Sequence, residues 1–231
     1  MADALHLDEV TKRYGQAAPV IDGMTHTFAP GTVTGLVGPN GSGKTTLLRL
    51  LSVTAYPTRG TVRYGDLDIH AHPYRYLQHV GIVHAEATLP EHLSAVELLT
   101  WILRARGGWD EAAGPARIAE LLDALGLDER RENLIGTYSS GMVQKTHIAA
   151  ALVARPRVLL MDEPLRSLDA ASSEATVDLL RAFKAEGGLA VVASHLAGTL
   201  EEVVDDAIAL GAAAESFAAL RPTAPGRQTG R

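Results

Sequence analysis

The sequence predicts an α/β fold: a mostly parallel open sheet, an inserted helical region and an N-terminal antiparallel β region. Continuous apolar runs at 158–161 and 190–193 have the character of strands that are covered on both faces, and a short β-branched and apolar run at 33–37 predicts another strand. A glycine-rich loop joins the run at 33–37 to an expected helix over 45–51. Alternation of strands and helices implies right-handed crossovers and an open sheet.

Composition narrows the possible functions. The chain has 231 residues, enough for one large domain, and a net charge of −6. An acidic chain lacks the basic surface that nucleic-acid binding needs, so we expect no nucleic-acid partner. Cysteine is absent, which excludes disulfides and thiolate-bound metals. No apolar run approaches the roughly 20 residues of a membrane-spanning helix, so any membrane role is expected to need a partner.

The middle of the chain reads as helical. Ser94 and Glu97 fit a capping box at a helix start. A second helix is expected over Ala116 to Leu125, with Gly126 as its end, and a third from Ser139 or Ser140 to the stop at 155–156. We therefore expect one domain over 1–220, made of a core (1–84 and 156–220) and a helical subdomain (85–155). Residues 221–231 are expected to be a disordered tail.

The glycine-rich loop matches the pattern G-x-x-x-x-G-K-[ST] at every position. Its glycines allow backbone amides to converge on phosphate oxygens, and the helix that follows adds a partial positive charge. We expect Lys44 to reach the β- and γ-phosphates and the Thr45 hydroxyl to bind Mg²⁺. The loop predicts a P-loop NTPase with a RecA-like core. The nucleotide-binding residues are expected to be Gly38, Pro39, Asn40, Gly41, Ser42, Gly43, Lys44, Thr45 and Thr46.

Two acids follow the apolar run at 158–161. In open α/β sheets ligands lie beyond the carboxyl ends of the strands, so Asp162 is expected to face the loop and hold Mg²⁺. Glu163 is placed to act as general base for an attacking water. His195 follows the run at 190–193 and is expected to contact the γ-phosphate.

Together these segments resemble the ATP-binding cassette (ABC) family over nearly the whole chain. Tyr138 to Met142, followed by Gln144, is similar to the signature L-S-G-G-Q of that family. The resemblance implies that Ser139, Ser140 and Gly141 bind the γ-phosphate of ATP held by a second copy of the chain, at a helix N-terminus. It also implies that Asp169 belongs to the loop that crosses the dimer interface, and that Tyr14 stacks on adenine.

One segment departs from the family pattern. Where the family has a glutamine that binds Mg²⁺ and links to the permease, this chain has His84, Ala85 and Glu86. Alanine cannot bind a metal, so Glu86 is the expected substitute. Ser140 stands where the family usually has glycine, which a capped helix start should tolerate.

The resemblance implies an ATP-hydrolysing subunit of a transporter, with ATP and Mg²⁺ as cofactors and Glu163, His195 and Lys44 as catalytic residues. It implies a dimer with a second copy or a paralogue, bound to a transmembrane permease at the cytoplasmic face of the plasma membrane. The signature variant is similar to those of exporters of drugs and antibiotics. An alternative is a soluble ABC ATPase of translation or DNA repair. A P-loop kinase or switch GTPase is a more distant one.

Overall fold

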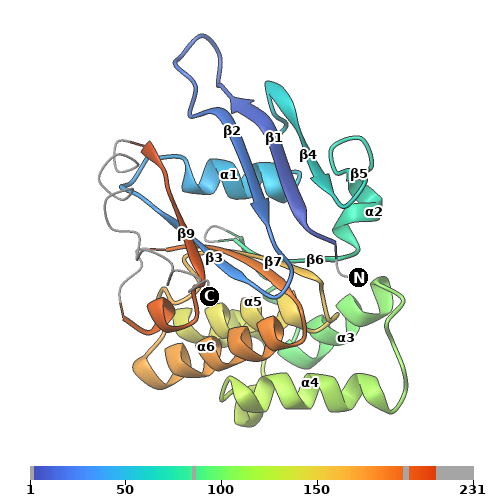
Figure 1. The fold of residues 1–231 in the computed structure, drawn as a ribbon. Coiled ribbons are helices and arrows are strands. Elements are labelled where there is room, and N and C mark those ends of the chain that lie inside the picture. Colours follow the sequence, from blue (N-terminus) through green and yellow to red (C-terminus); the bar gives the residue numbers. More distant parts are fainter. Residues whose placement is uncertain (1–2, 85–86, 195–197, 212–231) are drawn as a thin grey trace, which may run out of the picture.

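The computed structural model describes residues 3–84, 87–194 and 198–211 and contains two sheets (Figure 1). The strands of the first are antiparallel, in the order β2-β1-β4-β5: β1 (Leu5–Lys12), β2 (Ile21–Phe28), β4 (Arg59–Tyr64) and β5 (Leu67–Asp68). The strands of the second are parallel, in the order β6-β7-β8-β3-β9: β3 (Val33–Val37), β6 (Val80–Val83), β7 (Val158–Asp162), β8 (Leu189–Ala193) and β9 (Asp206–Ala209). The predicted α/β class and the N-terminal antiparallel region are confirmed.

Helices cover the parallel sheet on both faces. The long ones are α1 (Lys44–Leu51), α3 (Ala95–Ala105), α4 (Ala113–Ala124), α5 (Ser140–Leu152) and α6 (Ala170–Ala185). Three short ones are α2 (Pro73–Leu77), η1 (Asp128–Arg130) and η2 (Ile135–Thr137), and η3 (Gly198–Glu202) precedes β9. In Figure 1 helices α3 to α6 lie below the parallel sheet, and α1 lies on the side of the antiparallel sheet.

Two hydrophobic clusters divide the core at the parallel sheet. In β7, Leu159 and Met161 pack with the helices α3 to α6, while Val158 and Leu160 pack with α1 and the antiparallel sheet. Successive strand residues point to opposite faces, so a strand with apolar neighbours on both sides must be apolar throughout. This explains why the run at 158–161 has no polar alternation.

Helix α4 begins at Ala113, three residues before the expected start at Ala116. The Asp110 carboxylate accepts hydrogen bonds from the backbone N–H groups of Ala112 and Ala113, which holds the chain in a turn ahead of the helix. Pro115 lies in the first turn, where its missing N–H is not needed. The expected start at Ala116 places Pro115 before the helix, although the first turn of a helix also accepts proline.

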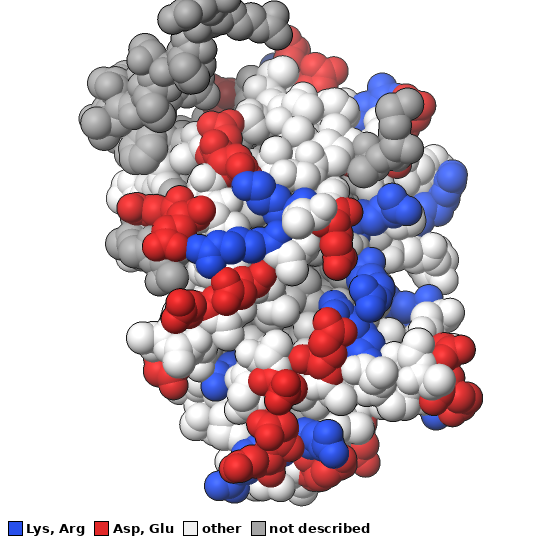
Figure 2. Space-filling model, turned by 60° about the horizontal axis from the view of Figure 1, so that its bottom comes forward, with Lys and Arg blue, Asp and Glu red and all other residues white. Residues whose placement is uncertain are grey.

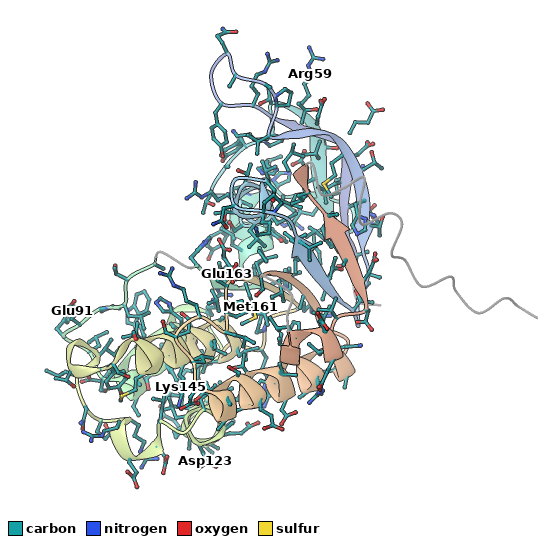
Figure 3. The ribbon with its side chains drawn as sticks, turned by 90° about the vertical axis from the view of Figure 1, so that its left-hand side faces the viewer. Arg59, Glu91, Asp123, Lys145, Met161 and Glu163 are labelled. Atoms are coloured by element: carbon teal, nitrogen blue, oxygen red, sulfur yellow. The ribbon has the colours of Figure 1, made fainter. Side chains whose placement is uncertain are left out.

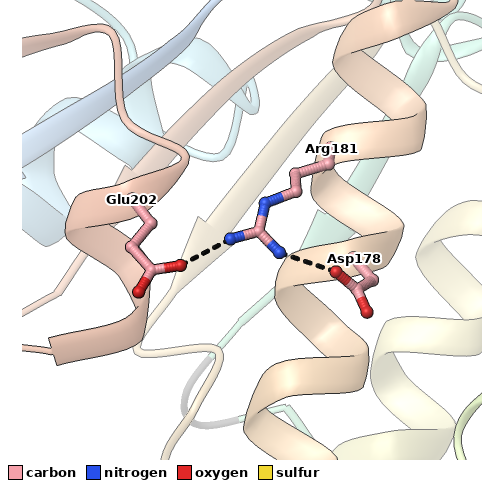
Figure 4. A network of polar contacts seen from close by, with 3 residues as sticks. All are labelled: Asp178, Arg181 and Glu202. Carbon is pink, nitrogen blue, oxygen red and sulfur yellow. Dashed lines mark hydrogen bonds and ion pairs between the residues drawn. The ribbon is translucent and has the colours of Figure 1, made fainter.

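Ion pairs attach the segment before β9 to α6. Arg181 bridges Asp178, at 2.7 Å, and Glu202, at 2.6 Å (Figure 4). Lys184 pairs with Asp205, whose other carboxylate oxygen accepts a hydrogen bond from the backbone N–H of Val33 at 2.9 Å. These pairs are largely exposed, so each contributes about 1 kcal/mol or less, but together they align β9 with the start of β3.

Figure 2 shows acidic and basic side chains interspersed over the face that lies at the bottom of Figure 1. Neither sign forms a continuous field on this face. Within the described ranges, no helix combines the length and the apolar character that crossing a membrane requires.

The capping box of α3 gives a test of the fold. The Ser94 hydroxyl accepts from the backbone N–H of Glu97 at 3.2 Å, and the Glu97 carboxylate accepts from the Ser94 N–H at 2.8 Å. Ser94→Ala should lower the free energy of unfolding by about 1 kcal/mol in urea denaturation, because a backbone N–H in the first turn of the helix loses its acceptor. Glu97→Gln is the control, since glutamine also completes a capping box. An equal loss in both variants would contradict the assignment.

Candidate nucleotide-binding site

The predicted phosphate loop leaves the carboxyl end of β3 and enters α1. At Gly38, φ is +152°, and a Cβ there would lie 2.5 Å from the Ser42 hydroxyl and 2.6 Å from the Leu210 carbonyl oxygen. Any side chain at this position would therefore push the loop apart. Leu210 is tied back to β3 by a hydrogen bond from its backbone N–H to the Val37 carbonyl at 2.8 Å. Leu210 thus forms a wall behind the loop.

Lys44 is the first residue of α1 and is only 8% exposed. Its ammonium donates to the carbonyl oxygens of Gly38, at 2.6 Å, and Pro39, at 3.2 Å. The cation therefore lies over the loop, where its partners are neutral carbonyls. The buried Ser42 hydroxyl has no hydrogen-bond partner in the described part of the chain. A cation and an unpartnered hydroxyl in one loop fit an anionic ligand such as a phosphate.

Thr45 and Asp162 meet although they are 117 residues apart in sequence. The Thr45 hydroxyl donates to the Asp162 carboxylate at 3.0 Å, and Asp162 ends β7 with 6% of its surface exposed. A hydroxyl and a carboxylate are the hard oxygen ligands that Mg²⁺ prefers, usually together with substrate phosphates. Among the described residues, no group of three His, Cys, Asp or Glu side chains could hold a metal alone. The residues therefore fit a Mg²⁺ that shares its coordination with a nucleotide.

Glu163 has a strained backbone, with φ at +47°. Consecutive strand residues normally face opposite sides, but this positive φ lets Glu163 line the same pocket as Asp162. Its backbone N–H donates to the Ala193 carbonyl at 2.8 Å, and its carboxylate accepts from the Ser194 hydroxyl at 3.3 Å. Figure 3 places Glu163 beside Met161, between the helices around Lys145 and the end of the antiparallel region at Arg59. Glu91 and Asp123 lie in the helical part, away from it.

A pocket of about 610 Å³ collects these groups. It brings together the predicted residues Asn40, Gly41, Ser42, Gly43, Lys44, Thr45, Thr46, Asp162 and Glu163. Gly38 and Pro39 contribute from behind, through the carbonyls that hold Lys44. Sequence reasoning missed the other lining residues, which reach the pocket from outside the two motifs: Val20, Arg49, Thr54, His84 and Ala87.

Other predicted residues lie outside this pocket. Tyr14 is 46% exposed, and the Lys12 ammonium lies 4.9 Å from its ring centroid. Ser139 caps α5 by accepting from the backbone N–H of Met142 at 3.3 Å. Asp169 caps α6 by accepting from the backbone N–H of Ser172 at 2.8 Å, and hydrogen bonds from Ser172 lower the pKa of this carboxylate. Ser140 and Gly141 begin α5 and do not line the pocket either.

His195 and Glu86, expected at the γ-phosphate and at the metal, fall outside the described residues. His84, next to the departing segment, lines the pocket instead. Burial lowers the pKa of His84, while the nearby Asp162 carboxylate acts to raise it and Arg49 to lower it. Burial thus favours the neutral ring, which carries one N–H donor.

Comparisons with known proteins agree with this geometry. The family model described as "ABC transporter" matches residues 21–166. The lipoprotein-releasing system ATP-binding protein LolD 1 of Rhodospirillum rubrum is 35% identical, over 87% of this chain and 94% of the relative. The daunorubicin/doxorubicin resistance ATP-binding protein DrrA of Streptomyces peucetius is 32% identical over 80% of this chain. The present chain spans 56% of the length of that relative.

Among solved structures, the ATP-binding subunit of an ABC transporter superposes with a TM-score of 0.83 at 26% identity. The match covers 89% of this chain and 85% of that subunit. The resemblance drawn from the loop, the acid pair and the signature is thus confirmed by sequence and by fold. The chain belongs to the ABC transporter family and carries its ATP-binding domain.

Proposed function

We propose that the chain binds and hydrolyses ATP and thereby powers export of a substrate through a separate membrane permease. The observation that carries the proposal is the single pocket in which Lys44, Thr45, Asp162 and Glu163 meet. A phosphate-binding cation, a metal-binding pair and a base are the parts that phosphoryl transfer to water requires. Relatives named for resistance to doxorubicin and for bacitracin transport support the direction of export.

In the proposed reaction Lys44 exchanges its loop carbonyls for the β- and γ-phosphate oxygens. Thr45 and Asp162 would hold Mg²⁺, which when bound neutralises charge on the transferred phosphoryl group. Glu163 accepts a proton from the attacking water, and the Ser194 hydroxyl orients its carboxylate. Because Glu163 is not a ligand of the proposed metal, its charge remains available to the water.

The signature residues support a dimer. Ser139 and Ser140 are exposed at the N-terminus of the 13-residue helix α5, outside the pocket of their own chain. We propose that Ser139, Ser140 and Gly141 close over ATP bound to the P-loop of a second copy, with Asp169 near the same interface. Tyr14, Glu86 and His195 keep the roles expected from the sequence. The helical subdomain 85–155 then passes the closing motion to the permease, at the cytoplasmic face of the plasma membrane.

Removing the base should separate binding from hydrolysis. Glu163→Gln should lower ATP turnover about 100-fold or more, because a general base contributes at least that factor, while ATP binding persists.

Lys44→Ala should instead weaken ATP binding about 10-fold or more, because a hydrogen bond to a charged group is lost. A phosphate-release assay and a fluorescent-nucleotide titration measure the two effects. Normal turnover in Glu163→Gln would refute the base assignment.

Charge at the signature tests the dimer. In a Glu163→Gln background, ATP should produce a dimer in size-exclusion chromatography with light scattering. Adding Ser140→Glu should remove that dimer but leave ATP binding by the single chain within about twofold, since a new carboxylate would repel the partner's phosphates. An acid at a helix start does not destabilise the helix.

Ala113→Glu is the matched control for Ser140→Glu, because Ala113 is the exposed first residue of α4. This variant should dimerise as the parent does. Retention of the dimer in Ser140→Glu, or its loss in Ala113→Glu, would contradict the proposed interface.

Coupling to a permease distinguishes transport from other uses of ATP. An affinity-tagged chain should be recovered from detergent-solubilised membranes together with a multi-span membrane protein. Vesicles containing the pair should move substrate with ATP, and Glu163→Gln should stop that movement. Recovery with ribosomes or DNA in place of a membrane protein would favour a soluble ABC ATPase.

A further inference from the structure

One row of residues on helix α5 contacts the two segments that carry Glu163 and His84. Gly141, Gln144 and His147 are spaced by three, which places them on one side of the helix. A Cβ on Gly141 would lie 2.8 Å from the carbonyl oxygen of Ser167, so glycine permits the close approach at this end. The Gln144 side chain donates to the Pro164 carbonyl at 2.9 Å, immediately after Glu163. The row therefore begins at the signature and follows the segment that carries the proposed base.

At the inner end of the row, His147 lies near His84. His147 is 7% exposed, and burial lowers its pKa. The backbone of Ala87 acts on His147 as a hydrogen-bond partner, and the His84 ring is close enough to affect it electrostatically. His84 and Ala87 both line the nucleotide pocket, and the Ala87 N–H points to the His84 carbonyl at 3.4 Å. The buried His147 side chain of α5 thus lies behind His84 and Ala87, which line the pocket.

The place of His84 in the pocket indicates which part of a nucleotide it meets. The Asp162 carboxylate, which is bonded to Thr45, and Arg49 are the charged groups that act on His84. This end of the pocket also carries Glu163 and is where the terminal phosphate must lie for hydrolysis. Two carboxylates repel that phosphate, so donors are needed beside them. The imidazole ring of His84 supplies an N–H donor at this end of the pocket.

We propose that His84 donates a hydrogen bond to the terminal phosphate of bound ATP, and that His147 is a positioning residue that holds His84 and Ala87 against α5. The presence of the terminal phosphate is thereby transmitted along the row to Ser139 and Ser140. The inference rests on the proposed function, because it requires ATP in this pocket. It adds His84 and His147 to the γ-phosphate contact that the sequence analysis placed on His195.

Nucleotide binding tests this inference without relying on turnover. Fluorescent ATP and ADP analogues are titrated in magnesium buffer against the wild type, His84→Ala, His84→Gln and His147→Ala. His84→Ala should lose about tenfold in ATP affinity and less than twofold in ADP affinity, since one hydrogen bond to the terminal phosphate is removed. His84→Gln keeps an N–H donor and should recover ATP affinity to within about threefold. His92→Ala, at an exposed histidine outside the pocket, should match the wild type.

A second readout isolates the positioning role of His147. In the Glu163→Gln background, His147→Ala should raise the ATP concentration that produces dimer about tenfold, while ADP affinity stays within twofold. A residue needed only for packing would lower both nucleotide affinities together, or neither. An unchanged dimerisation midpoint in His147→Ala would overturn the positioning role.

ADP binding also serves as the folding control for each variant. If His84→Ala loses ADP binding, His84→Phe takes its place, since phenylalanine fills the site without a donor. If these variants change the affinities for ATP and for ADP by the same factor relative to the wild type, the role of His84 would be overturned. A wild-type chain that binds neither nucleotide would refute the proposed function itself, which is a different result.

Discussion

The hydrogen bond from Thr45 to Asp162 is the contact on which the site depends. It joins the helix that follows β3 to the end of β7, two strands that flank β8 in the parallel sheet. Because all three strands run the same way, their carboxyl ends meet at one edge, where the loop and the acids converge. The parallel topology therefore brings together the cation, the hydroxyl and the carboxylates. Neither local segment could make this pocket alone.

The parts of the site that could be predicted are those written in contiguous sequence. The loop from Gly38 to Thr46 and the acids Asp162 and Glu163 were located because each motif follows a recognisable strand. Val20, Arg49 and His84 were missed as lining residues because they lie outside the loop and the acid pair. Val20 precedes β2, Arg49 is in the last turn of α1, and His84 follows β6. No spacing rule links residues that only the folded sheet brings together.

The fold was predictable to a similar degree and for related reasons. The three predicted strands of the parallel sheet, β3, β7 and β8, were located within one residue, since apolar neighbours on both faces leave an unbroken apolar run. The start of α4 was misplaced, because a proline is compatible with either side of a helix boundary.

Ser139 and Asp169 are the N-terminal caps of α5 and α6. Their oxygens accept backbone N–H groups of their own helices, so a ligand at these positions would be met by preset geometry.

Strain at Glu163 connects this geometry to the wider molecule. A non-glycine residue with positive φ costs about 1–3 kcal/mol and persists only where its surroundings hold it. Here β8 holds its backbone through Ala193, and α5 holds the next residue through Gln144. The proposed base is therefore kept in place by the same helix whose first turn bears the signature. A shift of α5 would act on the segment at Glu163 and on the segment at His84, because Gln144 contacts the first and His147 the second. Through these contacts, binding of a nucleotide at the N-terminus of α5 can control hydrolysis at Glu163.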